Sequence, residues 1–97
     1  MNMQAMMQQA QKIQKEIAKA KNEINDKEFE ITKSFITVKA NGKKEIIKLN
    51  INEKNLNEED IDILEDLLTV TINELFKKID QETESKLGKY GIGSLGF

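Results

Sequence analysis

The side chains in this sequence that could do chemistry are lysines, glutamines and carboxylates, because the 97 residues include no histidine and no cysteine. The commonest general base, the commonest metal ligand and any thiolate site are therefore missing. The residue types that remain suit the binding of a charged partner better than catalysis. We expect a protein that is not an enzyme, with no metal site, no cofactor and no small-molecule substrate.

Three lysines recur at helical spacing near the start of the chain. At about 100° per residue, Lys12, Lys15 and Lys19 fall within about 60° of one another on a helical wheel. These lysines could contact phosphate groups of a nucleic acid, or they could form a helix face that is only exposed to solvent and has no binding function. Glu16 and Glu23 can partly neutralise this stripe through i,i+4 pairs.

Glutamines precede these lysines at Gln8, Gln9 and Gln11. Glutamine can read adenine through two hydrogen bonds in the major groove of a duplex, although a plain polar helix surface is the interpretation that we favour. All 15 basic residues are lysine, so the arginine contact that most often specifies guanine is missing. Any nucleic-acid binding should therefore show weak sequence preference and strong salt dependence.

A second group of lysines lies near the end of the chain and consists of Lys77, Lys78, Lys86 and Lys89. If the helices that carry the two groups pair antiparallel, this group joins Lys12, Lys15 and the glutamines at the tip of an arm. The intervening acids Asp80, Glu82 and Glu84 oppose that interpretation.

The acids are concentrated in one part of the chain. The net charge is −2, yet residues 1–27, 28–49 and 86–97 each carry +2, and residues 50–85 carry −8. A metal or acid–base site would need convergent carboxylates, whereas these acids follow the start of a predicted helix, where the helix dipole favours them. The densest group consists of Glu58, Glu59, Asp60, Asp62, Glu65 and Asp66.

The apolar pattern predicts the elements that position these side chains. A heptad-like seam with spacings of three and four indicates a long first helix that ends at Asn25-Asp26. This seam consists of Met3, Met6, Ala10, Ile13, Ile17, Ala20 and Ile24. The period then changes to two, which predicts three antiparallel strands. Their alternating apolar residues are Phe29 and Ile31, then Ile36, Val38 and Ala40, then Ile47, Leu49 and Ile51.

The predicted turns rest on local signals. Lys33-Ser34 is the predicted first turn, and Asn41-Gly42 is a strong hairpin signal of the type I′ turn. Asn57 is a plausible N-cap for a second long helix that ends at about Leu87, with Gly88 as its stop. The apolar stripe of this helix includes Ile61, Leu64, Leu68, Thr71, Leu75 and Ile79. We expect residues 1–88 to form one domain and residues 89–97 to form a flexible, glycine-rich tail whose apolar residues can dock.

The lengths of these elements favour a homodimer. The two helices span about 33 and 45 Å, whereas a strand of six residues spans only about 20 Å, so both helices must overhang the sheet. Their overhanging stripes can form a two-helix arm, and a second copy can cover the sheet. Candidate residues for the arm or dimer seam are Ile13, Ile17, Ile24, Leu64, Leu68 and Leu75.

Four segments, in this order, resemble the YbaB/EbfC family of nucleoid-associated proteins over essentially the whole chain. They are Met3 to Lys12, the strand from Ile36 into Asn41-Gly42, Leu64 to Leu68 followed by Asn73 and by Leu75 to Lys78, and Gly91 to Phe97. The family often has glycines between the first two strands and a proline after the third. At these two turns this chain has Thr32-Lys33-Ser34 and Asn52-Glu53-Lys54 instead.

The resemblance implies an α+β fold of the order α-β-β-β-α, a tweezer-like homodimer and binding of double-stranded DNA in the nucleoid. The implied role is in nucleoid organisation, gene expression or DNA repair. Candidate DNA-binding residues are Gln8, Gln11, Lys12, Lys15, Lys19, Lys77, Lys78 and Lys86. The alternative is a protein-partner or RNA-binding adaptor, which salt dependence separates from a DNA binder. No apolar run approaches the roughly 20 residues of a membrane span, so we expect a cytoplasmic protein.

Overall fold

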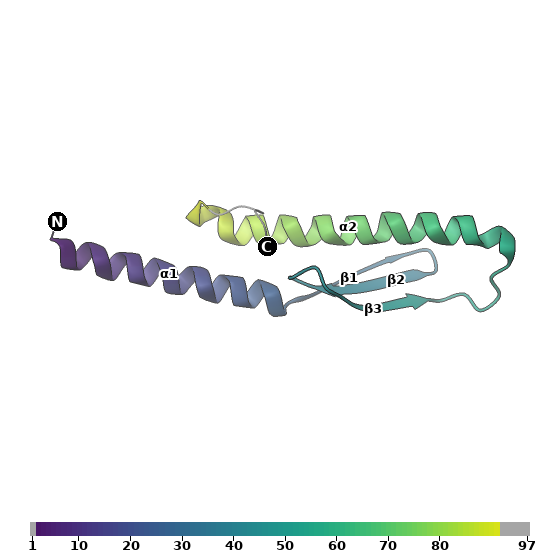
Figure 1. Cartoon of the computed structure of the whole chain (residues 1–97), viewed down its shortest axis with the longest axis horizontal. Coiled ribbons are helices and arrows are strands. Elements are labelled where there is room, and N and C mark those ends of the chain that lie inside the picture. Colours follow the sequence, from purple (N-terminus) through teal and green to yellow (C-terminus); the bar gives the residue numbers. More distant parts are fainter. Residues whose placement is uncertain (1, 92–97) are drawn as a thin grey trace.

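The computed structural model describes residues 2–91 of the chain. The elements are α1 (Met3–Asp26), β1 (Glu28–Lys33), β2 (Ile36–Asn41), β3 (Ile46–Ile51), a 3-10 turn η1 (Glu58–Asp60), α2 (Ile61–Leu87) and a 3-10 turn η2 (Gly88–Tyr90). The expected order α-β-β-β-α is therefore confirmed. The molecule is elongated, 71 × 17 × 15 Å, because both helices run past the ends of the sheet (Figure 1).

Helix α1 forms where the sequence predicts it. The side chain of Asn2 caps its start by accepting a hydrogen bond from the Ala5 N–H at 2.7 Å, and the backbone turns extended at Lys27. The predicted seam is buried only at its C-terminal end. Ile24 is buried and Ile17 is half-buried, whereas the side chain of Ile13 is 40% exposed.

The sheet has the strand order β1-β2-β3, with both pairs antiparallel. Lys33 pairs with Ile36, so the first turn is Ser34-Phe35, one residue later than the prediction. The half-buried Phe35 packs against the core, which favours this register. Only Ser34 of the two has a positive φ, 53°, which is the φ pattern of a type II′ turn.

The second hairpin lies at Asn41-Gly42 as predicted, but the type I′ turn is wrong. Neither residue has a positive φ, and the left-handed residue is Lys44, with a φ of 62°. Asn41 N–H donates to the Glu45 carbonyl at 3.1 Å, and Lys44 N–H donates to the Asn41 carbonyl at 3.0 Å. The loop therefore has three residues, and the Asn41 side chain stabilises it by accepting from the Lys43 and Glu45 N–H groups.

Gly42 is required by packing and not by its own backbone angles. A Cβ atom at Gly42 would lie 1.8 Å from the carbonyl oxygen of Ile24, in the last turns of α1. The hairpin between β2 and β3 and the end of α1 can therefore touch only because this position carries no side chain. The contact sets where α1 leaves the sheet.

Helix α2 begins after η1, where Asn57 N–H donates to Asp60 Oδ2 at 2.9 Å. Its buried residues recur every four positions, at Thr71, Leu75, Ile79, Thr83 and Leu87. Leu75 and Ile79 complete a core with four residues of the sheet, Phe29, Ile36, Val38 and Ala40. The core therefore lies between α2 and the strands β1 and β2.

The end of α2 follows the prediction only in part. The helix ends at Leu87, but Gly88 keeps helical angles (φ −59°, ψ −34°) and opens η2. The left-handed residue is Gly91, with a φ of 77°, and its N–H donates to the Gly88 carbonyl at 2.9 Å. Lys89 and Tyr90 belong to η2, and the rest of the predicted tail, residues 92–97, lies outside the described residues.

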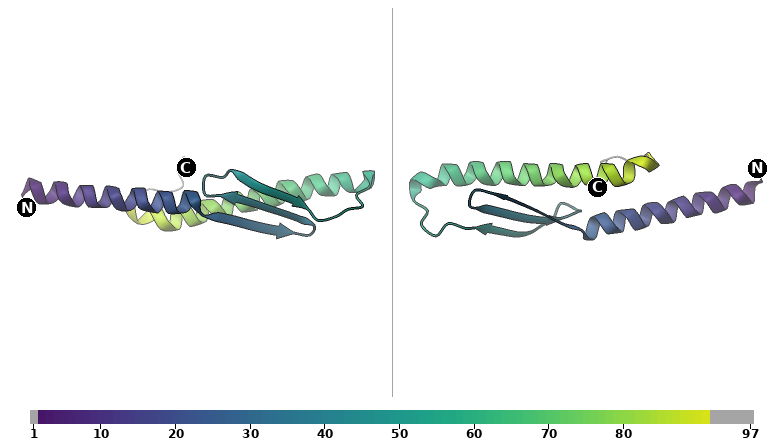
Figure 2. Two further views of the ribbon diagram at one scale, coloured as in Figure 1. Left: turned by 90° about the horizontal axis from the view of Figure 1, so that it is seen from below. Right: turned by 180° about the vertical axis from the view of Figure 1, so that it is seen from behind.

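Helix α2 covers one face of the sheet over β1 and β2. On the same face, β3 is left uncovered. Its apolar side chains at Ile46, Ile47, Leu49 and Ile51 are all exposed, between 40% and 51%. Leu49 pairs with the buried Val38 and Ile51 with the buried Ile36, so these two point to the α2 side of the sheet. Figure 2 shows the three strands as one layer that lies along α2.

We predict that Gly42→Ala destabilises the protein by about 2 kcal/mol, because the added methyl group overpacks the contact with Ile24. The midpoint of urea unfolding measures this loss. Gly88→Ala is the matched control, because nothing lies within 4 Å of a Cβ at that position. Equal stability of the Gly42→Ala protein and the wild type would contradict the close contact.

Candidate nucleic-acid interface

The lysine stripe predicted on the first helix lies on one exposed face of α1. Its residues line a single shallow, open hollow together with two glutamines and one glutamate: Gln8, Gln11, Lys12, Lys15, Glu16 and Lys19. The structure therefore brings five of the eight candidate DNA-binding residues together on one helix. We call the surface formed by Lys12, Lys15 and Lys19 the lysine face.

The positive charge of the lysine face is not neutralised within residues 2–91. Its three lysines make no ion pair there, and the expected i,i+4 pairs with Glu16 and Glu23 are not formed. The Glu16 carboxylate instead accepts a long hydrogen bond, 3.4 Å, from the hydroxyl of Tyr90. The lysines that do pair with acids lie elsewhere: Lys27, Lys33, Lys39, Lys44 and Lys86. The lysine face is therefore available to an outside anion.

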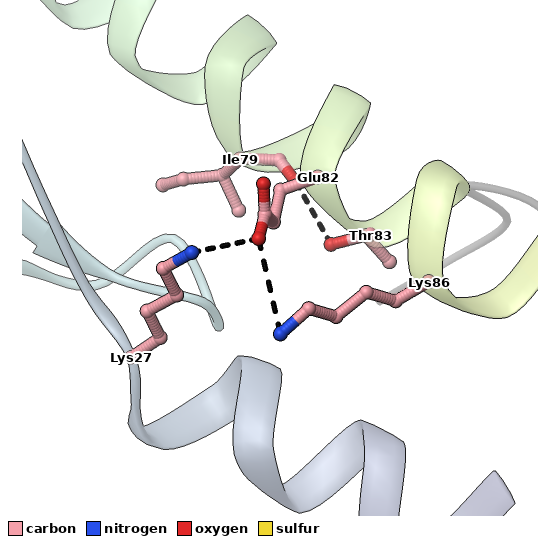
Figure 3. A network of polar contacts seen from close by, with 5 residues as sticks. All are labelled: Lys27, Ile79, Glu82, Thr83 and Lys86. Atoms are coloured by element: carbon pink, nitrogen blue, oxygen red, sulfur yellow. Dashed lines mark hydrogen bonds and ion pairs between the residues drawn. The ribbon is translucent and has the colours of Figure 1, made fainter.

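An ion-pair cluster holds the base of α1 against α2 (Figure 3). The Lys27 ammonium donates to Glu82 Oε1 at 2.7 Å, and the Lys86 ammonium lies 3.8 Å from the same oxygen. The Lys27 ammonium also lies 5.2 Å from the centroid of the Phe29 ring. The hydrogen bond from Lys27 lowers the pKa of the Glu82 carboxyl below its ordinary value. Lys86 is thereby engaged, which makes it a weaker candidate for phosphate contact.

The predicted arm tip, with the late lysines beside the start of the first helix, is wrong. Lys86 and Lys27 share Glu82, so this part of α2 lies at the end of α1 and not at its start. Lys77 and Lys78 directly precede Ile79, which packs in the core, so they are level with the sheet. The cause is that α2 runs along the sheet first, and only its last turns reach α1.

Among the late lysines, Lys89 comes nearest to the lysine face. Its ammonium lies 5.0 Å from the centroid of the Tyr90 ring, and both residues line a hollow with Lys19. Glu16, Ala20 and Glu23 complete that hollow. Helix α2 and its extension η2 therefore end beside the middle of α1.

The acidic residues near the start of α2 do not form a metal centre. Within residues 2–91, no group of three or more acidic side chains is placed to hold a metal ion. The Asp60 side chain instead accepts a hydrogen bond at the start of the helix. In the same part of the chain, no helix is long and apolar enough to cross a membrane.

A model of the YbaB/EbfC DNA-binding family matches residues 1–95 of the chain. The chain belongs to this family. It is 45% identical over 98 residues to a nucleoid-associated protein of Enterococcus faecalis, with 99% of this chain and 94% of the relative covered. It is 47% identical over 97 residues to a nucleoid-associated protein of Mycoplasmopsis pulmonis, with 100% and 97% covered. The resemblance seen in the sequence is therefore confirmed, and both relatives are bacterial.

The Lys27–Glu82 contact was missed by the sequence analysis. The two residues are 55 positions apart, and no helical or strand periodicity links them. The hydrogen bond from Lys27 is the largest cause of the lowered pKa, and the local sequence shows only the smaller contributions of Lys78 and Lys86 on the same helix.

We predict that Glu82→Gln lowers the free energy of unfolding by about 0.2–1 kcal/mol at pH 7, the range for partly exposed ion pairs. The folded-state pKa of Glu82 lies below its ordinary value, so the stabilisation is present above about pH 4.3 and is lost as the pH falls through the folded-state pKa. Thermal unfolding at pH 7 and at pH 3 measures the difference.

Glu84→Gln is the matched control for this measurement, because Glu84 lies on the same helix and makes no ion pair within the described residues. We expect it to leave the stability at both pH values unchanged. A Glu82→Gln effect that is as large at pH 3 as at pH 7 would contradict a role for the charged carboxylate.

Proposed function

We propose that this chain is a non-enzymatic nucleoid-associated protein of the bacterial cytoplasm that binds duplex DNA through the lysine face of α1. The observation that carries the proposal is the charge of Lys12, Lys15 and Lys19 on one exposed helix face, which no ion pair within residues 2–91 neutralises. The family description and the names of the relatives support it. The cellular role that follows is nucleoid organisation, with effects on gene expression or DNA repair.

The net charge of −2 is compatible with DNA binding because the charges are separated along the molecule. The acids near the start of α2 lie at one end of the elongated fold, and the lysine face lies toward the other end (Figure 1). Surface charges are screened over about 8–10 Å at physiological salt, which is far less than this separation. A DNA duplex bound at α1 is therefore attracted by the lysine face, and the distant acids are screened from it.

The chemistry of the lysine face favours phosphate contacts over base contacts. Lys12 and Lys19 are about 10 Å apart along the helix axis, which corresponds to about three phosphates of one strand at 3.4 Å each. Lysine presents a mobile point charge and lacks the flat fork with which arginine reads guanine. Binding should therefore weaken steeply with salt and depend little on sequence.

The open side of β3 supports a homodimer. Ile47, Leu49 and Ile51 form an apolar surface that α2 leaves uncovered, and β3 is also an edge strand of the sheet. Natural proteins rarely leave such an edge exposed, and a second copy can cover it by two-fold pairing. The arms formed by α1 and the end of α2 would then project from a central sheet, as tweezers do.

A protein-partner or RNA-binding adaptor is the second candidate. It is favoured by the exposed start of the predicted heptad seam, where the side chains of Met3 and Met6 are 78% and 52% exposed. Such a seam can pack against a helix of another protein. Apolar binding of that kind depends little on salt, whereas phosphate binding depends on it steeply.

We predict that a Lys12/Lys15/Lys19→Gln triple mutant loses most of its affinity for a duplex of about 30 base pairs. Three phosphate contacts contribute about −2.7 to the slope of log K against the logarithm of the salt concentration. The slope of the mutant should therefore be less steep by up to about 2.7. Fluorescence anisotropy between roughly 50 and 200 mM salt measures both quantities.

The matched control removes the same charge from the sheet end of the molecule. Lys43, Lys48 and Lys54 are exposed and make no ion pair within residues 2–91, so a triple glutamine mutant should bind nearly as the wild type does. Equal losses in both mutants would argue for a diffuse charge effect. No binding by the wild type at low salt would favour the adaptor.

We predict that Leu49→Glu converts a homodimer of about 22 kDa into a monomer of 11.1 kDa, because it places a charge on the apolar face of β3. Sedimentation equilibrium at micromolar concentration measures the mass. Lys48→Glu is the control, because it changes the charge of the same strand on the opposite face. A wild type that sediments as a monomer would contradict the homodimer.

A further inference from the structure

The distal half of α1 projects as a single helix. Helix α2 and η2 end beside Glu16, whose carboxylate lies 3.4 Å from the Tyr90 hydroxyl. Every residue from Asn2 to Glu16 is exposed, and the ribbon of α1 extends well past the end of α2 in both Figure 1 and Figure 2. At 1.5 Å per residue, residues 3–15 give a rod about 18 Å long.

The width of this rod matches one feature of duplex DNA. A single helix with its side chains is about 10–12 Å across, and the major groove of B-form DNA is about 12 Å wide. A pair of packed helices, with axes 8–10 Å apart, would be about 20 Å across and would not fit. The early end of α2 therefore leaves a part of the arm that can enter the groove.

The side chains on one face of the rod suit that groove. Gln4, Gln8 and Gln11 fall within about 100° of one another and of the lysine face on the helical wheel, with no acid between Met3 and Lys15. The glutamines lie toward the free end of the rod, and the lysines lie toward its base. A glutamine amide can donate to N7 of adenine through its NH2 group and accept from the N6 amino group through its oxygen at the same time. Guanine presents two acceptors there and offers no comparable bidentate match.

We propose that the distal half of α1 enters the major groove of duplex DNA as a single helix, where Gln4, Gln8 and Gln11 contact adenine edges. Lys12, Lys15 and Lys19 hold the flanking phosphates. The inference rests on the proposed function and deepens it, because it assigns a groove and a base to the same surface. The result is a modest preference for A·T pairs on top of binding that phosphate contacts dominate.

The apolar seam is compatible with this arrangement. Met6 and Ile13 lie on the side of α1 that turns away from Gln4, Gln8 and Gln11 on the helical wheel. Insertion of the glutamine side into the groove leaves the seam facing out of it. One face of the helix can therefore contact DNA while the opposite, apolar face stays outside the groove.

The experiment compares two duplexes of identical sequence, rich in A·T pairs, in one of which 7-deazaadenine replaces adenine. This base lacks the N7 acceptor in the major groove and keeps its Watson–Crick and minor-groove edges. We expect the wild type to bind the modified duplex about fivefold or more weakly, the effect of losing one good bidentate contact. A Gln4/Gln8/Gln11→Ala mutant should bind both duplexes equally, since alanine preserves the helix.

Gln9→Ala is the matched control, because Gln9 lies about 100° from Gln8 around the same helix, and it should keep the discrimination of the wild type. Wild-type binding that is equal for both duplexes would overturn the groove contact and leave the proposed function standing. Absence of binding to either duplex would overturn both. Equal binding to double-stranded RNA, whose major groove is too narrow for a helix, would also overturn the inference.

Discussion

The packing of α2 on β1 and β2 is the constraint on which the rest of the structure depends. Leu75 and Ile79 are buried against Phe29, Ile36 and Val38, and this contact fixes where α2 lies along the sheet. Because α2 covers the sheet first, only its last turns remain to meet α1. Among residues 2–91, the same packing leaves β3 uncovered on one side and the distal half of α1 exposed at the other end. Both surfaces available to partners therefore follow from one interface.

The direction of α1 depends on two further contacts near its end. Gly42 lets the β2–β3 hairpin touch the Ile24 carbonyl, and Glu82 binds the Lys27 ammonium. One contact is steric and the other is electrostatic. A rod that projects about 18 Å beyond its support needs such a fixed base, because a small rotation there moves its tip by several ångströms.

The sequence predicted the elements well because their signals are local. The change of apolar period from three-and-four to two separates α1 from the strands, and the acids after Asn57 mark the start of the last helix. The turn types were predicted less well. The Asn41-Gly42 dipeptide favours a type I′ turn on its own, but the approach of Ile24 requires a small residue in a different, three-residue loop.

The candidate site shows the same division between local and long-range information. Lys12, Lys15 and Lys19 were placed on one face correctly, because helical geometry alone relates them. Lys77 and Lys78 were placed at the wrong end of the arm, because the relative position of two helices depends on the sheet between them. Nor could the sequence show that Lys86 shares Glu82 with Lys27, a contact that needs the tertiary fold.

The exposure of the distal half of α1 also explains its composition. An isolated helix of about a dozen residues is marginal in water, and no residue of this segment is buried against another element of residues 2–91. Its stability must come from continuity with the anchored half, from the Asn2 cap and from intrinsic propensity. Residues 3–15 accordingly consist of Met, Gln, Ala and Lys, which are among the better helix formers, with one Ile. The composition that gives the segment its long polar side chains is thus also the one that keeps it helical without a partner.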